Sequence, residues 1–402
     1  MENNPSTAVP SARAMMVPLV TMTVVQILVT TAGFAVPVFA VPLALDLGVA
    51  PGSIGFYMSA VFSTAMIGAI LGGHGVRRFG PIRMAQLGLA SAALALLILS
   101  TGMLALVVLA ALFMGLAYGP VTPASSYILA RTTPSRLMPL VFSIKQTGVP
   151  AGGALAGLLV PPMVLAWGWR GAAIAIAIVC LTAIPMLQPL RRQLDHDRAL
   201  GEQGNGGFFE PIRMVLGEPI LRRMAFMSFS FSAVQMSMIA YLVTFLIEVV
   251  GLDLIAAGLV LAAAQLAGVV GRIVWGAASG AVVDAHRLLI GLGIAMTGAS
   301  LGTAGFASDW PPLALYATVI LFGATAIGWN GVFLAEFARI APPGQVGIAT
   351  AGAVFITFGG IAVAPGLFGL LLAGGLGYTG GFVMLALIAV IGTCLVASSA
   401  RR

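Results

Sequence analysis

Apolar segments of about 20 residues recur along this chain of 402 residues, and short polar stretches separate them. An α-helix needs roughly 20 apolar residues to cross the hydrocarbon core of a bilayer. Backbone polar groups must be paired inside lipid, so such segments can cross it only as helices or as closed barrels. The mean hydropathy of +1.07 and the charged fraction of 8% are typical of membrane chains. The sequence therefore predicts an all-α polytopic membrane protein.

Twelve spans can be delimited on this basis, six in each half of the chain. They cover 17–44, 54–74, 83–102, 104–130, 138–164 and 168–190, then 222–247, 255–280, 287–307, 311–337, 346–374 and 378–399. The first apolar stretch is too long for the core of a cleavable signal peptide. We expect two six-helix bundles.

The stretch between the two groups of spans is strongly polar. Residues 191–223 hold six of the nineteen basic and five of the twelve acidic residues. Charge at this density is too costly in hydrocarbon. We therefore expect an N-terminal bundle over 1–190, a water-exposed linker over 191–221 and a C-terminal bundle over 222–402.

The basic residues predict the orientation. With the N-terminus in the cytoplasm, sixteen of nineteen fall on the cytoplasmic side and Arg170 alone falls at the opposite surface. Cytoplasmic loops carry such an excess of Lys and Arg. Both termini are predicted to be cytoplasmic. The dominance of Arg over Lys, with the richness in Ala, Gly and Leu, favours a bacterial genome of high GC content, and we expect a bacterial inner membrane. The net charge of +7 therefore needs no nucleic acid as a partner.

The two halves resemble each other at a nearly constant offset. Pro134 matches Pro343 and Gln26 matches Gln235 at an offset of 209 residues. Gly73 matches Gly280 at an offset of 207. Six helices per half bring both halves into the membrane from the same side, so the repeat is parallel and the bundles are pseudo-symmetric.

Several motifs resemble those of the major facilitator superfamily, and the resemblance covers almost the whole length. The segment GHGVRRFGPIR over 73–83 is similar to the family's loop between helices 2 and 3, with Arg77 in place of an acidic residue. Its repeat GAVVDAHR over 280–287 keeps that acid as Asp284. The segments GVPAGG over 148–153 and GWR over 168–170 are also similar. The resemblance implies a transporter with a central cavity that opens alternately to each side.

Two basic side chains fall inside predicted spans, Lys145 in the fifth and Arg272 in the eighth. Ionisable groups there are costly and mark functional sites. A guanidinium binds a carboxylate through two hydrogen bonds, and an ammonium adds a second charge. The pair predicts a small organic anion, such as a carboxylate, as substrate. Two alternatives stay open: Lys145 could reach the inner surface with its long stem, and Arg272 could pair with Glu336 or Asp284.

An arginine in the eighth helix also resembles the oxalate:formate antiporter and the monocarboxylate transporters. The antiporter has a second cation in the eleventh helix, and the monocarboxylate carriers have a lysine in the first. This chain has neither, so its subfamily stays open.

Polar side chains on the helices that line the family's cavity complete the candidate substrate site. They are Gln26, Thr30, Tyr118, Thr122, Gln235, Tyr241, Trp329 and Asn330. Such groups bind a ligand or hydrogen-bond between helices. Glu336, three residues before Arg339, could form a local salt bridge, or could couple or gate transport together with Asp284 and Arg77.

The sequence favours a monomer that is not an enzyme and that needs no cofactor or metal. No nucleotide-binding loop, nucleophile motif or pair of catalytic carboxylates is present. Efflux of drugs by proton antiport stays open as an alternative, as does a membrane sensor that transports nothing. No carboxylate or histidine falls near the middle of a span. We therefore expect a bound proton to travel with the substrate's own carboxyl group, or the protein to exchange one anion for another.

Overall fold

The computed structural model describes residues 12–134, 137–195, 209–280, 282–342 and 345–399. Eleven helical segments of these residues are long and apolar enough to cross a membrane. One of them, Leu140–Leu194, contains 55 residues. At 1.5 Å per residue a straight helix of that length would greatly exceed the roughly 30 Å of a hydrocarbon core. The chain turns back at Gly168, where φ is 69° and ψ is 169°. This segment therefore makes two crossings, and the predicted helical architecture is confirmed.

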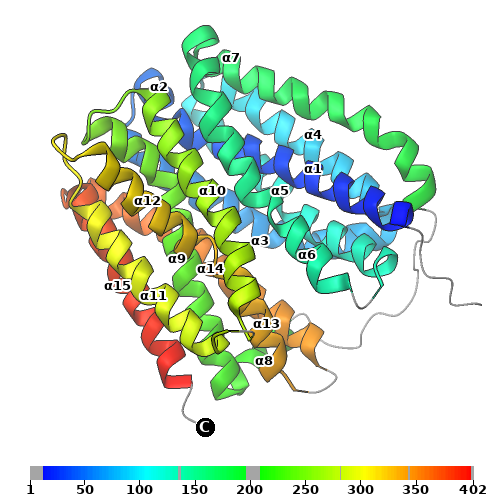
Figure 1. The fold of residues 1–402 in the computed structure, drawn as a ribbon. Helices are drawn as coiled ribbons and strands as arrows, with labels where there is room; N and C mark the ends of the chain where they lie inside the picture. The colour runs from blue at the N-terminus through cyan, green and yellow to red at the C-terminus, as the bar shows by residue number, and fades with distance from the viewer. Residues whose placement is uncertain (1–11, 135–136, 196–208, 281, 343–344, 400–402) are drawn as a thin grey trace, which may run out of the picture.

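The helices follow each other in two groups, which Figure 1 colours from blue to green and from green to red. The first group is α1 (Ala12–Val38), α2 (Ala40–Leu47), η1 (Pro51–Ser53), α3 (Ile54–Phe79), α4 (Pro81–Ser100), α5 (Leu104–Thr132), α6 (Met138–Gln146) and α7 (Gly148–Leu194). The second is α8 (Glu210–Gly217), α9 (Pro219–Glu248), α10 (Leu254–Ala278), α11 (Ala285–Ala304), α12 (Pro312–Ala326), α13 (Asn330–Ile340), α14 (Val346–Ala373) and α15 (Gly377–Ser399).

The predicted linker contains more helix than the sequence indicates. Helix α7 continues to Leu194, and the eight residues of α8 form a further helix. Val215 of α8 is buried and lies against Gly352 of α14. Eight residues are too few to span a bilayer. Residues 196–208 of the linker lie outside the described part of the chain.

The two halves pack tightly at one end, which we term the closed end. There Gly157 of α7 faces Gly258 of α10, and a Cβ on either glycine would clash with the backbone of the other. The Gly366 amide of α14 donates to Ser59 Oγ of α3 at 2.8 Å. Glycines permit this close approach because they carry no side chain. Both helix pairs join one half to the other.

A buried carboxylate holds the loop between α3 and α4. Asp195, at the end of α7, accepts hydrogen bonds from the amides of Ile82 (2.9 Å) and Arg83 (3.1 Å), one on each oxygen. These amides open α4, where a negative charge is favoured by the helix dipole. The approach needs a glycine at position 80, where φ is 91° and a Cβ would collide with Asp195. The loop thus receives a carboxylate from a distant segment, while Arg77 stands where the family's own acid is expected.

Replacing Asp195 with asparagine is expected to destabilise the N-terminal half by about 0.5–2 kcal/mol, the usual range for losing a helix cap. One carboxylate oxygen becomes an NH₂ group that faces a backbone N–H. The measurement is the midpoint of thermal unfolding in detergent. Asp253→Asn is the matched control, because Asp253 caps α10 with Oδ1 alone, at 2.9 Å from both amides, and asparagine keeps that oxygen. Equal midpoints for the two variants would contradict this role of Asp195.

Candidate functional site

Arg272 connects the two halves of the molecule from α10. Its Nε donates to the Ile327 carbonyl at 3.1 Å, within the C-terminal half. One of its terminal nitrogens, Nη1, donates to the Gln146 carbonyl of α6 at 2.6 Å, across the interface. Arg272 lies fourteen residues from Gly258, or about 21 Å along the helix. It is therefore well removed from the closed end.

Both carbonyls are available because the helices are interrupted there. In a continuous helix the Gln146 carbonyl would accept the amide of residue 150, but Pro150 has none. Residues 327–329 form a turn between α12 and α13. At this turn Trp275 Nε1 donates to the Ala324 carbonyl at 2.8 Å. Side chains of α10 thus take the place of missing helical amides.

Lys145 is buried at the end of α6, with an exposed fraction of 2%. It does not extend to the surface. Its Nζ lies 3.5 Å from Gln146 Oε1, at the outer limit of a hydrogen bond. Gln146 therefore contacts both cations, Lys145 through its side chain and Arg272 through its carbonyl. Among the described residues, neither cation forms a salt bridge with a carboxylate.

Three predicted residues of the N-terminal half lie together, and one of them, Tyr118, interacts with Arg272. Gln26 Nε2 of α1 donates to Thr30 Oγ1 at 3.2 Å, and both side chains are buried. The Tyr118 hydroxyl of α5 lies within interaction range of Thr30 and Arg272. Gln26 Oε1 is buried and has no protein partner among the described residues. This wall of the site therefore offers a free acceptor and a hydroxyl.

Three predicted residues of the C-terminal half form a second group. The Gln235 side-chain oxygen accepts from Trp329 Nε1 at 3.3 Å and from Asn330 Nδ2 at 3.2 Å. Trp329 and Asn330 adjoin the turn whose Ile327 carbonyl receives Arg272. The interruption between α12 and α13 thus positions the guanidinium and the amides together.

Tyr241 and Thr122 are placed differently. The Tyr241 hydroxyl lies 3.0 Å from the Gly52 carbonyl and 2.9 Å from that of Pro365, so it joins the halves at the closed end. Its ring stacks on Phe368 at 4.1 Å between centroids. Thr122 is half-buried on α5, where its carbonyl accepts from Ser125 Oγ. These contacts do not bring either side chain to the cations.

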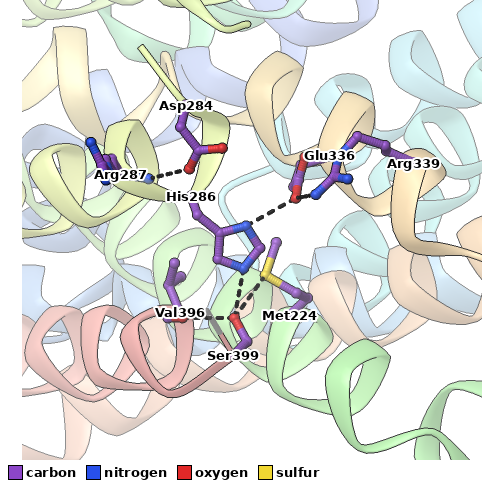
Figure 2. Close-up of polar contacts among 8 residues, drawn as sticks. All are labelled: Met224, Asp284, His286, Arg287, Glu336, Arg339, Val396 and Ser399. Carbon is purple, nitrogen blue, oxygen red and sulfur yellow. Dashed lines mark hydrogen bonds and ion pairs between the residues drawn. The ribbon is translucent and has the colours of Figure 1, made fainter. Parts of the chain in front are cut away.

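Two of the three predicted gate residues, Glu336 and Asp284, lie within the C-terminal half (Figure 2). Glu336 of α13 is buried and accepts from Arg339 Nε at 2.7 Å and Nη2 at 2.6 Å. Asp284 begins α11 and accepts from the Arg287 amide at 3.2 Å. Arg272 therefore pairs with neither acid. The side chain of Arg77 lies outside the described part of the structure.

One polar residue of the interface was missed. Gln265 lies seven residues before Arg272 and is fully buried against Gly153 of α7. Neither its amide oxygen nor its amide nitrogen has a protein partner among the described residues. The spacing of seven residues, which places both side chains on one face of α10, could have indicated it.

A family model and a curated relative match most of this chain. The family model described as Major Facilitator Superfamily matches residues 22–365. A gentisate transporter of Corynebacterium glutamicum is 27% identical over 292 residues, which are 69% of this chain and 63% of that protein.

Solved structures share the fold. A bacterial homologue of the human lysosomal transporter Spinster, in an inward-facing and occupied conformation, aligns with a TM-score of 0.77 at 14% identity, over 97% of this chain and 98% of that one. The nucleoside transporter NupG aligns with a TM-score of 0.76 at 12% identity, over 96% and 100%.

Proposed function

Because the chain belongs to the Major Facilitator Superfamily, a family of transporters, we propose that it carries a small organic carboxylate across the membrane by alternating access. The observation that carries this proposal is the pair of cations, Lys145 and Arg272, which meet at Gln146 from opposite halves without a carboxylate partner among the described residues. Charge buried in this way needs a counter-charge. A carboxylate supplies it.

The neighbouring side chains favour an aromatic or hydroxylated carboxylate. Tyr118 and Gln26 offer hydroxyl and amide groups on one side, and Asn330 on the other. The relative from Corynebacterium carries gentisate, an aromatic hydroxycarboxylate, which suits such a lining. Export of cationic drugs fits poorly, because a cationic substrate would meet two positive charges.

We infer that the substrate also sets the coupling. An empty site carries two unbalanced cations, and moving these through a low-dielectric region is costly. A loaded site is closer to neutral and reorients more readily. The carrier therefore exchanges anions, or takes up a proton together with its substrate. We place it in a bacterial inner membrane as a monomer with both termini in the cytoplasm, so that the closed end faces outward.

Counterflow in proteoliposomes tests this proposal. Vesicles preloaded with unlabelled gentisate, benzoate or a neutral sugar are diluted into labelled carboxylate. We expect transient accumulation of label only in the carboxylate-loaded vesicles, because exchange requires a loaded site on both faces. If a labelled cationic drug, offered to the same vesicles in place of the carboxylate, accumulated instead, efflux would be favoured. Binding of the carboxylate without any flux would indicate a sensor.

A further inference from the structure

His286 lies at the centre of a buried polar cluster that the proposed substrate site does not include (Figure 2). Its Nδ1 is 2.9 Å from Glu336 Oε1 on α13, and its Nε2 is 2.8 Å from Ser399 Oγ on α15. The exposed fraction is 9% for His286 and 3% for Glu336. Four helices meet here, because Met224 of α9 also contacts Ser399.

The hydrogen bonds of this cluster can be satisfied with either charge on the imidazole. When His286 is protonated, both ring nitrogens donate, Nδ1 to Glu336 and Nε2 to Ser399 Oγ. The serine hydroxyl then donates to the Val396 carbonyl, which lies 2.6 Å away. When Nε2 is deprotonated, the same hydroxyl rotates and donates to it. Hydroxyl hydrogens rotate freely in this way, so neither state leaves a ring nitrogen unpaired.

The charges around His286 favour a reversible change in the charge of its imidazole ring. Glu336 supplies a buried negative charge that attracts a proton to the ring. Arg339 opposes this, because it binds the same carboxylate from a side chain that is 68% exposed. Asp284 and Arg287 at the start of α11 are both exposed and offset each other in sign. At the start of α9, Glu218, Arg222 and Arg223 are also exposed, and Arg223 Nη1 donates to the Ser398 carbonyl at 2.6 Å. Histidine is the side chain that ordinarily changes its charge between about pH 5 and 8.

We propose that His286, Glu336 and Ser399 form a proton-binding site of this carrier. One proton enters at Nε2 and is accommodated by rotation of the Ser399 hydroxyl. Nδ1 donates to Glu336 in both states, but only the protonated ring adds a positive charge beside the carboxylate that Arg339 binds, so proton uptake weakens the hold of Glu336 on Arg339. The site needs no substrate, and it gives the C-terminal half a proton-linked change where α11, α13 and α15 meet.

Nuclear magnetic resonance of histidine-labelled protein in nanodiscs tests this directly, because the chain has only three histidines. In the substrate-free protein, we expect a resonance that titrates reversibly between about pH 5 and 8 and is lost in His286→Gln. Arg339→Gln should move its midpoint to higher pH, because a nearby positive charge is removed. Glu336→Gln should move it to lower pH.

Two control variants, Arg287→Gln and Ser398→Ala, distinguish an effect of the cluster from an effect of general surface charge. Arg287→Gln removes an exposed arginine of the same helix and should move the midpoint less than Arg339→Gln does. Ser399→Ala removes the acceptor for the protonated ring and should lower the midpoint, whereas Ser398→Ala, whose hydroxyl donates to Leu395, should not. A His286 resonance that stays in one form from pH 5 to 8, or equal shifts for Arg339→Gln and Arg287→Gln, would overturn the proposal. The readout is independent of transport.

Discussion

Arg272→Ala is expected to lower the affinity of the carrier for its carboxylate substrate by about 10–150-fold. A hydrogen bond to a charged partner contributes about 1.5–3 kcal/mol, and about 1.4 kcal/mol is a factor of ten in a dissociation constant. The alanine variant also loses the bonds to Ile327 and Gln146, so the two halves lose a contact at the site. Isothermal titration of purified protein measures the affinity.

Arg272→Lys should recover only part of this loss. The lysine ammonium keeps the positive charge, but it lacks the planar guanidinium that can bind two carbonyls and a carboxylate at once. Arg222→Ala is the control, because Arg222 is exposed and, among the described residues, its side chain hydrogen-bonds to the Leu216 carbonyl. Unchanged carboxylate binding in a folded Arg272→Ala protein would make Arg272 a structural bridge and would remove the main support for an anionic substrate.

Much of the fold could be predicted because hydrophobic length is a local property. Each span is long enough to cross hydrocarbon, and the turn at Gly168 falls where the sixth span was expected to start. The polar contacts of the linker were harder to predict. Asp195 reaches Ile82 over 113 positions of sequence, so no local pattern could pair them. Because this contact holds Asp195 at the end of α7, the helix extends further than its hydrophobicity indicates.

The sequence predicts which residues form the site better than it predicts their hydrogen-bond partners. The sequence indicates Gln235, Trp329 and Asn330 by their polarity on cavity-lining helices, and their hydrogen bonds bring them together. Polarity alone does not distinguish them from Tyr241, whose hydroxyl closes the interface at Gly52. That difference depends on how the two halves dock. The sequence contains one unused signal, Pro150, which frees the carbonyl that Arg272 binds.

Docking of the halves also predicts a variant that should stop transport without touching the substrate. Gly157→Val places a branched side chain where the carbonyl of Gly258 and the backbone of Ala262 lie. Overpacking a tight contact costs about 1–3 kcal/mol, which shifts a two-state equilibrium by about 5–150-fold. The strain exists only while the closed end is closed, so the equilibrium moves toward opening at that end. Exchange in proteoliposomes should fall by a similar factor, because alternating access requires both states.

Gly298→Val is the matched control, since a Cβ at Gly298 of α11 meets no atom within 4 Å. A cysteine at position 262 reports the opening, because Ala262 is 2% exposed. With Cys180 and Cys394 replaced by alanine, a membrane-impermeant maleimide should label Ala262→Cys faster in the Gly157→Val protein than in the control. Slow labelling in both proteins, together with lost exchange, would mean that valine distorts the bundle and not the equilibrium. Unimpaired exchange would mean that α7 and α10 do not need to approach this closely, and that the closed end is sealed by the contacts between α3 and α14 instead.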